Sequence, residues 1–410
     1  MPFDINRVRS QYPALREGYT HFDGAAGTLV AARCADAIAD VTGGAVANKT
    51  TAFAAGRRAL EIVVRAREAV GDLLGARADG VVFGPSATAL TYLVARTLAD
   101  GWGPQDEIVV SRLDHDANVR PWLQVAARSG TTVRWAEFDP ATGELPAEQY
   151  GHLVNERTRL VAVTAASNAI GTRPDVAAIA RAAHDAGALV YVDGVHATPH
   201  APTDVAALGA DFYVTSAYKW SGPHIAACVA APSRWESLRP EKLMPSPDDV
   251  PERFEFGTPS FELLAGVTGA IDHLASLAAD DASDADAGDA GTGTRRARLI
   301  ESLSAAQVYE MTLFTQLVDG LAEIDGVRMC PAPADRCPTV AFRVGDQDPA
   351  RTAELLGDEG ICVFSGDYYA YEYFHATGLR DTGGAVRASV YHYTTAAEVD
   401  LLLDAVKRSR

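Results

Sequence analysis

A carboxylate and a lysine near the middle of the chain follow two apolar runs and are the residues best placed for chemistry. Residues 188–192 and 212–214 are unbroken and rich in β-branched side chains, which predicts two buried parallel strands. Asp193 directly follows the first run, and Lys219 lies just beyond the second. Open α/β sheets bind their ligands at the carboxyl ends of such strands. Only four lysines occur in 410 residues, so a lysine at this place calls for a chemical explanation.

Catalysis by pyridoxal 5'-phosphate (PLP) needs such a pair. A lysine forms a Schiff base with the cofactor, and an acid keeps the pyridinium nitrogen protonated. Burial lowers the pKa of a lysine and favours the free amine that this bond requires. On Asp193 and Lys219 alone, an ordinary ion pair at the edge of a sheet is an equal alternative, since structural ion pairs also occupy clefts.

The segment around this pair resembles the class V aminotransferase group of fold type I PLP enzymes, with its cysteine desulfurase and selenocysteine lyase relatives. Asp193 and Lys219 stand 26 positions apart, as the pattern of that group asks. The stretch SAYKWSGPH, residues 216–224, is similar to a cysteine desulfurase-like branch near the isopenicillin N epimerase relatives. The resemblance runs from HFDGAAGT at residue 21 to VRASVYHYTT at residue 386 and implies PLP as the cofactor.

Strands and helices alternate over residues 81–230, which predicts a mostly parallel sheet with right-handed crossovers. With the resemblance, this gives an α/β fold of PLP type I with two domains. The large domain spans residues 21–278, with helices flanking its sheet, and a small α+β domain is formed by residues 1–20 and 295–410. Residues 279–294, ADDASDADAGDAGTGT, predict a disordered acidic insertion, with an acidic tether for a partner as the alternative.

A strand, a small-residue turn and a helix follow one another from residue 81 and predict an anion site. The first amides of a helix are unpaired and lie at the positive end of its dipole. As the phosphate site of the family, this turn implies binding by the backbone of Ala87 and the hydroxyl of Thr88. Ser216 and Tyr218 add hydroxyls that face the phosphate, and the resemblance brings Thr258 from the other subunit of a homodimer.

Three further residues are matched to the family's contacts with the cofactor ring. His115 matches the histidine that stacks on the pyridine face, and Asn168 matches the asparagine at the phenolic oxygen, where it also borders the substrate. His196 is expected to bond a cofactor oxygen or to move a proton. From the residues alone, these three are a loop histidine, a turn-forming asparagine and a structural histidine.

The substrate is expected between an arginine and a row of small residues. Arg387 matches the family's arginine that pairs bidentately with the amino-acid carboxylate, a task suited to a planar guanidinium. Ala25 and Ala26 match the loop that lines the substrate pocket, and Tyr369 belongs to a tyrosine cluster that should shape it. In this scheme Lys219 is the base at Cα, and Asp193 with His115 and His196 completes the catalytic set.

One feature departs from the desulfurases, which carry a mobile loop cysteine that accepts sulfur as a persulfide. The corresponding segment here, residues 360–379, carries tyrosines but no loop cysteine, and Cys362 falls in an expected strand as an apolar filler. We therefore expect PLP chemistry on an amino acid, with desulfurase-like C–S cleavage by a lyase or a sulfurtransferase. Epimerisation or other chemistry at Cα is the alternative, and a PLP-binding regulator or scaffold is the non-enzymatic one.

Composition excludes several other classes. The net charge of −18 argues against nucleic acid and anionic membranes as partners. The five cysteines are scattered without metal-binding spacing, and no glycine motif of a nicotinamide dehydrogenase follows a first strand. The N-terminus lacks the apolar segment of a signal peptide, and no apolar run is long enough to span a bilayer, so the expected location is the cytoplasm.

Overall fold

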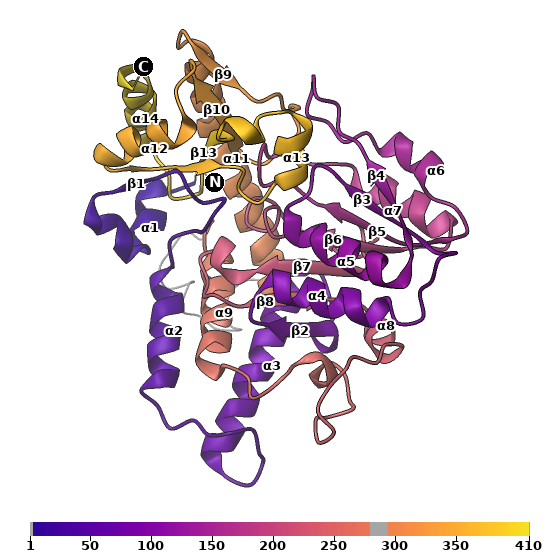
Figure 1. The fold of residues 1–410 in the computed structure, drawn as a ribbon. Coiled ribbons are helices and arrows are strands. Elements are labelled where there is room, and N and C mark those ends of the chain that lie inside the picture. Colours follow the sequence, from indigo (N-terminus) through magenta and orange to yellow (C-terminus); the bar gives the residue numbers. More distant parts are fainter. Residues whose placement is uncertain (1–2, 279–293, 410) are drawn as a thin grey trace.

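The computed structural model describes residues 3–278 and 294–409 (Figure 1). The acidic insertion predicted at 279–294 therefore lies outside the described residues, apart from Thr294. None of the helices in these two ranges is long and apolar enough to cross a membrane.

A seven-stranded sheet forms the centre of the molecule, in the order β2-β8-β7-β6-β5-β3-β4. Its strands are β2 (Val81–Gly84), β3 (Glu107–Ser111), β4 (Thr132–Ala136), β5 (Thr158–Thr164), β6 (Leu189–Asp193), β7 (Phe212–Ser216) and β8 (Ala226–Val229). All neighbouring pairs are parallel except those made by β8, which runs opposite to both β7 and β2. The predicted mostly parallel sheet is confirmed, and β6 ends on Asp193 itself.

Helices cover both faces of this sheet, because successive strand side chains point to opposite sides. Val190 and Val192 pack into one core, whereas Tyr191 between them packs into the other. The first face is covered by α2 (Ala32–Thr42), α3 (Ala54–Leu74), α7 (Val176–Asp185) and α9 (Phe261–Leu274), and the second by α4 (Ala87–Leu98) and α5 (Arg120–Ser129). Because both faces of the sheet are buried, the sequences of the central strands are unbroken apolar runs. The short helices α6 (Tyr150–Leu153) and α8 (Pro232–Glu236) lie in connections.

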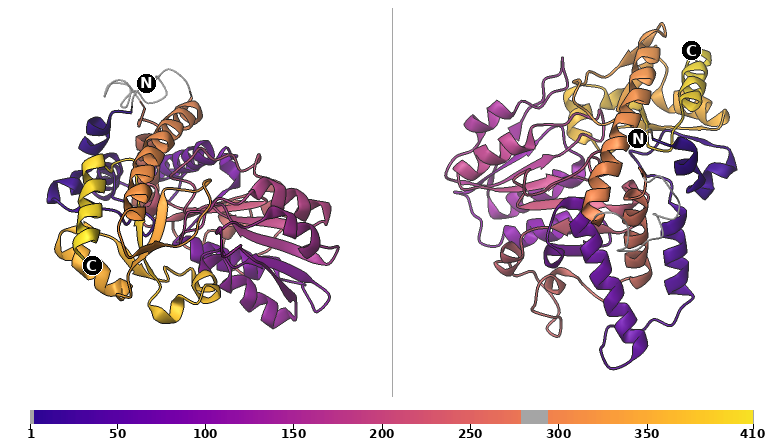
Figure 2. Two further views of the ribbon diagram at one scale, coloured as in Figure 1. Left: turned by 90° about the horizontal axis from the view of Figure 1, so that it is seen from above. Right: turned by 180° about the vertical axis from the view of Figure 1, so that it is seen from behind.

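A second layer is built on an antiparallel sheet of order β12-β13-β10-β9. Its strands are β9 (Val327–Met329), β10 (Thr339–Val344), β12 (Phe364–Gly366) and β13 (Ala385–Ser389). Around it lie α1 (Ile5–Ser10), α12 (Pro349–Asp358), α13 (Tyr371–Ala376) and α14 (Ala396–Arg408), and β1 (Thr20–His21) pairs in parallel with β11 (Ile361–Cys362). The long α11 (Arg295–Ala322) runs from α3 and α9 up to α14 and joins the two layers (Figure 2). The domain boundary at residues 278 and 295 stays a prediction.

Candidate active site

The carboxyl ends of three neighbouring strands carry the residues predicted to hold the cofactor. Asp193 ends β6, Lys219 closes a single turn of 3₁₀ helix directly after β7, and Asn168 lies four residues beyond β5. Arg387 reaches the same place from the middle of β13 in the other sheet. Residues from two sheets therefore meet at one site, where sequence reasoning expected them.

Lys219 is buried, and its Nζ donates a hydrogen bond to the backbone carbonyl of Ala25. Burial lowers the pKa of this amine to about 7, helped by the charge of Arg387 and opposed by Asp23 and Asp193. A lysine with such a pKa is largely in the free-base form just above neutral pH. The lysine can therefore act as a nucleophile or a base at the pH of a cell.

Asp193 is the second buried group at this point. Its Oδ1 accepts a hydrogen bond of 2.9 Å from the backbone N–H of Val195. Burial raises the pKa of the carboxyl to about 6, against the N–H of Val195 and the charge of Lys219. Within the described ranges no cation lies within ion-pair distance of this carboxylate, so a cationic ring nitrogen of a ligand fits it.

His115 and Tyr369 form an aromatic wall. Their rings lie 5.6 Å apart between centroids and are inclined by 28°. Nδ1 of His115 accepts a hydrogen bond of 3.0 Å from the N–H of Ala117, so the neutral ring carries its proton on Nε2. Burial lowers the pKa of His115 to about 3, helped by the charges of Lys219 and Arg387, which keeps the ring neutral. A flat neutral ring suits stacking on a flat cofactor.

Tyr369 is 72% exposed and stands in an unusual turn. Both Tyr368 and Tyr369 have a left-handed backbone, with φ of 48° and 59°. Bulky residues rarely adopt this conformation, and such strain concentrates at functional sites. The turn is held by two bonds, from the side-chain amide of Asn168 to the carbonyl of Tyr368 and from the N–H of Asp116 to that of Tyr369.

Arg387 is buried, and its guanidinium is only partly used. Nη1 donates to the backbone carbonyl of Asn168 at 2.9 Å, and Nη2 makes a long contact of 3.4 Å to Oδ1 of Asp23. Nε of Arg387 and Oδ1 of Asn168 are buried without a hydrogen-bond partner in the described chain. One edge of the guanidinium, Nε with Nη2, thus remains available for a second carboxylate.

Asp23 was missed by sequence reasoning, which singled out only the neighbouring alanines Ala25 and Ala26. Ala25 touches Lys219 through its carbonyl, whereas Ala26 donates its N–H back to Asp23. A carboxylate next to a row of small residues at the end of a strand was the available signal. Its contact with Arg387 joins positions far apart in the chain, which a local pattern does not show.

His196 is buried close enough to Lys219 to feel its charge. Its Nε2 shares a hydrogen bond of 3.0 Å with the hydroxyl of Thr339. Burial, the neighbouring His200 and the charges of Lys219 and Arg387 hold the pKa of His196 well below its ordinary value. The ring is therefore neutral, and a role in which it carries a positive charge is disfavoured.

The turn before α4 differs in detail from the predicted phosphate site. Ser86 is the N-cap, and its hydroxyl accepts the N–H of Ala89 at 3.1 Å. Ala87 is buried at the first helical position, but the side chain of Thr88 is exposed. The preference of serine for N-caps could have singled out Ser86 from the sequence. On the other side Ser216 is buried, and Tyr218 stacks on His224 with ring centroids 4.7 Å apart.

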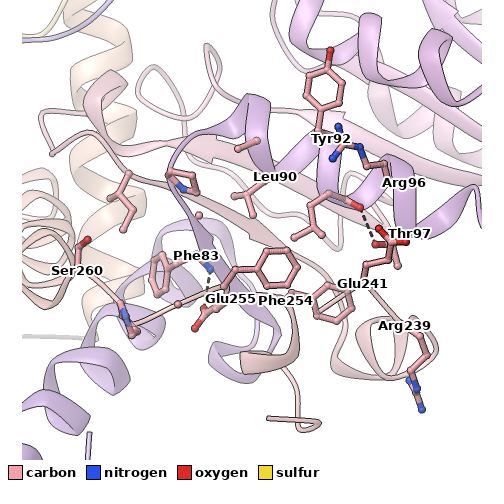
Figure 3. A pocket seen from close by; sticks show the side chains of 18 of the residues that line it. Phe83, Leu90, Tyr92, Arg96, Thr97, Arg239, Glu241, Phe254, Glu255 and Ser260 are labelled. Atoms are coloured by element: carbon pink, nitrogen blue, oxygen red, sulfur yellow. Dashed lines mark hydrogen bonds between the residues drawn. The ribbon is translucent and has the colours of Figure 1, made fainter. Parts of the chain in front are cut away.

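Thr258 is not part of the cluster around Lys219 within this chain. It is exposed and lines a separate cavity of about 1250 Å³, together with Gly84, Pro85 and His224 (Figure 3). Phe83 and Glu255 join the two walls of this cavity through a hydrogen bond of 2.9 Å. The cavity therefore borders the turn predicted to bind phosphate.

These features fit PLP. The site offers a lysine amine with a pKa of about 7 for the aldehyde and, within the described ranges, a buried carboxylate without a cation at ion-pair distance for the ring nitrogen. The flat aromatic wall suits the ring face, and the N-terminus of α4 suits the phosphate. The unpartnered Oδ1 of Asn168 and Nε of Arg387 mark polar positions that a ligand would satisfy.

The pKa of Lys219 gives a first prediction. Cofactor-free protein should capture PLP, in a form fixed by borohydride, at a rate that rises through about pH 7 and levels off above it. An ordinary lysine would rise only near pH ~10.4. In the variant Lys219→Ala, which keeps Lys49, Lys242 and Lys407, no such plateau should appear. A midpoint near pH ~10 in the wild type would contradict the assignment.

The buried carboxyl of Asp193 gives a second prediction. Between pH 3.8 and about 6 the folded chain binds more protons at this site than the unfolded chain, so stability falls as the pH rises through that window. In cofactor-free protein at pH 7, Asp193→Asn should therefore raise the free energy of unfolding, by at most about 3 kcal/mol. Denaturant unfolding at pH 4 and pH 7 checks this, and a variant less stable at pH 7 would refute it.

Comparisons with known proteins identify the family and the fold. The family model "Aminotransferase class-V" matches residues 20–290 and 294–402. An uncharacterized protein of Mycobacterium tuberculosis is 36% identical over 99% of both chains, and a probable cysteine desulfurase of Pseudomonas aeruginosa is 31% identical over 98% of this chain and 97% of its own. The crystal structure of the cysteine desulfurase CsdA from Escherichia coli superposes with a TM-score of 0.85 at 27% identity, covering 100% of this chain and 99% of that one. These relatives confirm the fold of PLP type I, and enzymes of this kind depend on PLP. The chain belongs to the class V aminotransferase family, in its cysteine desulfurase-like part.

Proposed function

We propose that this protein is a PLP-dependent lyase that breaks the C–S bond of cysteine or a related amino acid. The observation that carries the proposal is the buried Lys219. The pKa of its amine is lowered to about 7, and the amine lies among Asp193, Arg387 and Asp23. Proton transfer at Cα needs a lysine of lowered pKa, and groups with such shifted pKa values cluster at functional sites.

Each residue of the cluster has a task in this reaction. PLP, when bound, supplies a ring that accepts the electrons released at Cα. Asp193 holds a proton at the ring nitrogen, and the neutral ring of His115 covers one face. Nζ of Lys219 takes the proton from Cα. Burial of Asp193 and Lys219 excludes water and strengthens their electrostatic contacts.

Arg387 orients the substrate. Its Nε and Nη2 form the edge that pairs with a carboxylate in two parallel hydrogen bonds, and only a long contact to Asp23 occupies that edge. Nη1, bonded to the carbonyl of Asn168, fixes the plane of the guanidinium. A substrate carboxylate placed on this edge brings Cα towards Lys219.

The cysteines favour release of free sulfide over transfer to the protein. Cys34, Cys228, Cys330 and Cys337 are buried, and only Cys362 is partly exposed. It lies in the expected strand, but it is not the buried filler that the sequence suggested. Burial and the neighbouring Asp23 raise the pKa of Cys362, so it stays a thiol and accepts sulfur poorly. In the lyase reaction the Cα–H and Cβ–S bonds break, sulfur leaves as hydrosulfide with the electron pair, and water completes the conversion to pyruvate and ammonium.

Product analysis tests this function. With PLP, L-cysteine and a thiol reductant, which would release sulfide from any persulfide, we expect sulfide, pyruvate and ammonium in equal amounts. Cys362→Ser should retain the full rate, because that thiol takes no part, whereas Lys219→Ala should abolish turnover. Alanine with sulfide, lost in Cys362→Ser, would establish a sulfurtransferase instead. Racemised cysteine would establish an epimerase, and a bound cofactor without turnover of any amino acid would favour a regulator or scaffold.

We further propose that the chain acts as a homodimer, with Thr258 at the phosphate of the other subunit. Support comes from the exposure of Thr258 on a cavity that borders the turn at Gly84 and Pro85, and from the exposed Phe256 beside it. Light scattering should give twice the mass of the chain.

Thr258→Ala should weaken retention of PLP by about tenfold, since one hydrogen bond to a charged group is lost. Thr315→Ala, an exposed threonine of α11, should leave retention unchanged. A monomer in solution that retains PLP equally well with Thr258→Ala would contradict this arrangement.

A further inference from the structure

Glu310 is a fully buried carboxylate that the reaction described above does not use. It lies on the apolar stripe of α11, in line with Ala306 and Leu313, where a charge is costly. Within the described ranges no lysine or arginine pairs with it. Its only ion-pair contacts are histidines, with Oε2 at 2.8 Å from Nδ1 of His200 and Oε1 at 3.6 Å from Nδ1 of His392.

The carboxylate sets the hydrogen-bond directions on the side of His392. At 3.6 Å, Oε1 of Glu310 and Nδ1 of His392 make an electrostatic contact and not a hydrogen bond, and neither atom has a hydrogen-bond partner in the described chain. Because the carboxylate attracts an N–H, this contact favours the proton of the ring on Nδ1. Nε2 of His392 is then an acceptor, and the hydroxyl of Tyr12 donates to it at 2.6 Å. With its proton committed, the oxygen of Tyr12 accepts from Ser221 at 2.7 Å and from His273 at 2.9 Å.

This chain of bonds ends on the turn that presents Lys219. Ser221 is two residues beyond the lysine and has a left-handed backbone, with φ of 64°. Its N–H donates to the hydroxyl of Thr28 at 2.8 Å, and Tyr391 donates its hydroxyl to the carbonyl of Lys219 at 2.9 Å. The ring of Tyr391 packs on His392 with centroids 4.2 Å apart, so the same cluster holds the turn at two points.

The other carboxylate oxygen of Glu310 connects, through His200, to His196. The ring of His200 meets that of His196 edge to face, with centroids 5.3 Å apart. His196 in turn is fixed through Thr339. Burial opposes ionisation of Glu310, yet His200 and His392 hold the pKa of its carboxyl below the ordinary value, so the group is charged.

Other titratable groups surround Glu310 and Lys219 and also affect their charge. Around Glu310 lie His200, His392, Tyr12, Tyr309, Tyr391, Tyr393 and Cys337. Around Lys219 lie Arg387, Asp23, Asp193, His115, His196 and Tyr218. Among the described residues, Glu310 makes no hydrogen bond or ion pair with the second set, so its action passes through His200 and His392.

We propose that Glu310 is a positioning residue for Lys219: through His392 and Tyr12 it fixes the strained turn from Lys219 to Ser221, and through His200 it backs His196. The inference rests on the proposed function in one respect, namely that Lys219 is the residue that reacts with PLP. Burial is what lowers the basicity of the lysine, so a turn released from Tyr12 exposes the amine and makes it more basic.

The first measurement uses cofactor-free protein labelled with ¹⁵N histidine. The imidazole shifts should show His392 with its proton on Nδ1. In Glu310→Gln the amide can also donate and the charge is gone, so the proton of His392 should move to Nε2 in a substantial fraction of molecules. A wild-type ring protonated on Nε2 overturns the proposal, even if Glu310→Gln does not fold.

The second measurement is the pH profile of PLP capture by Lys219, fixed with borohydride. Glu310→Gln and Tyr12→Phe, which cuts the link to Ser221, should both move the midpoint upward by about one pH unit. Glu107→Gln is the matched control, because Glu107 is a buried carboxylate at the far end of β3 and pairs with Arg134 and Arg157. It should leave the midpoint unchanged.

A purely structural role is distinguishable from this. If Glu310→Gln lowers thermal stability as Glu107→Gln does but keeps the wild-type histidine shifts and midpoint, the proposal is wrong. If instead the proposed function is wrong, the wild type should not capture PLP at all. The proton of His392 should then still be on Nδ1.

Discussion

The burial of one amine governs the arrangement of this site. Taking Lys219 out of water raises the free energy of its charged form, and the surrounding charges only partly offset that cost. Asp193 and Arg387 are buried beside it, where the two sheets meet. Neither sheet alone would enclose these three side chains. The parallel sheet supplies the strand ends, and β13 of the second sheet supplies the guanidinium that closes the site above them.

Local patterns in the sequence predicted where the residues of the parallel sheet lie, but not their roles. Asp193, Lys219 and Asn168 each follow a buried strand, and the period of the apolar residues reveals those strands. The resemblance to class V aminotransferases added Arg387, His115 and the role of Asn168, for which the flanking residues alone indicate little. The large sheet was also predictable, since strands buried on both faces read as continuous apolar runs.

Other contacts were invisible to that reasoning, because they join distant parts of the chain. Asp23 and Arg387 are 364 positions apart, and His200 and Glu310 are 110 apart. The only local trace of Glu310 is a charge on an otherwise apolar helical stripe, a conflict between pattern and composition that often marks function. At the start of α4 the helix itself was predicted, but Ser86 as its N-cap was not singled out.

Under the role proposed for Arg387, its contact with Asp23 couples substrate binding to protons. Burial already raises the pKa of Asp23, and Arg387 is the principal group that counteracts this. When a substrate carboxylate takes the guanidinium edge, Asp23 loses that compensation and its affinity for a proton increases. Binding is then accompanied by proton uptake, so by linkage the affinity for an amino acid declines as the medium becomes more alkaline. The free protein thus keeps its arginine partly neutralised by an internal carboxylate that yields, by protonation, to the carboxylate of the substrate.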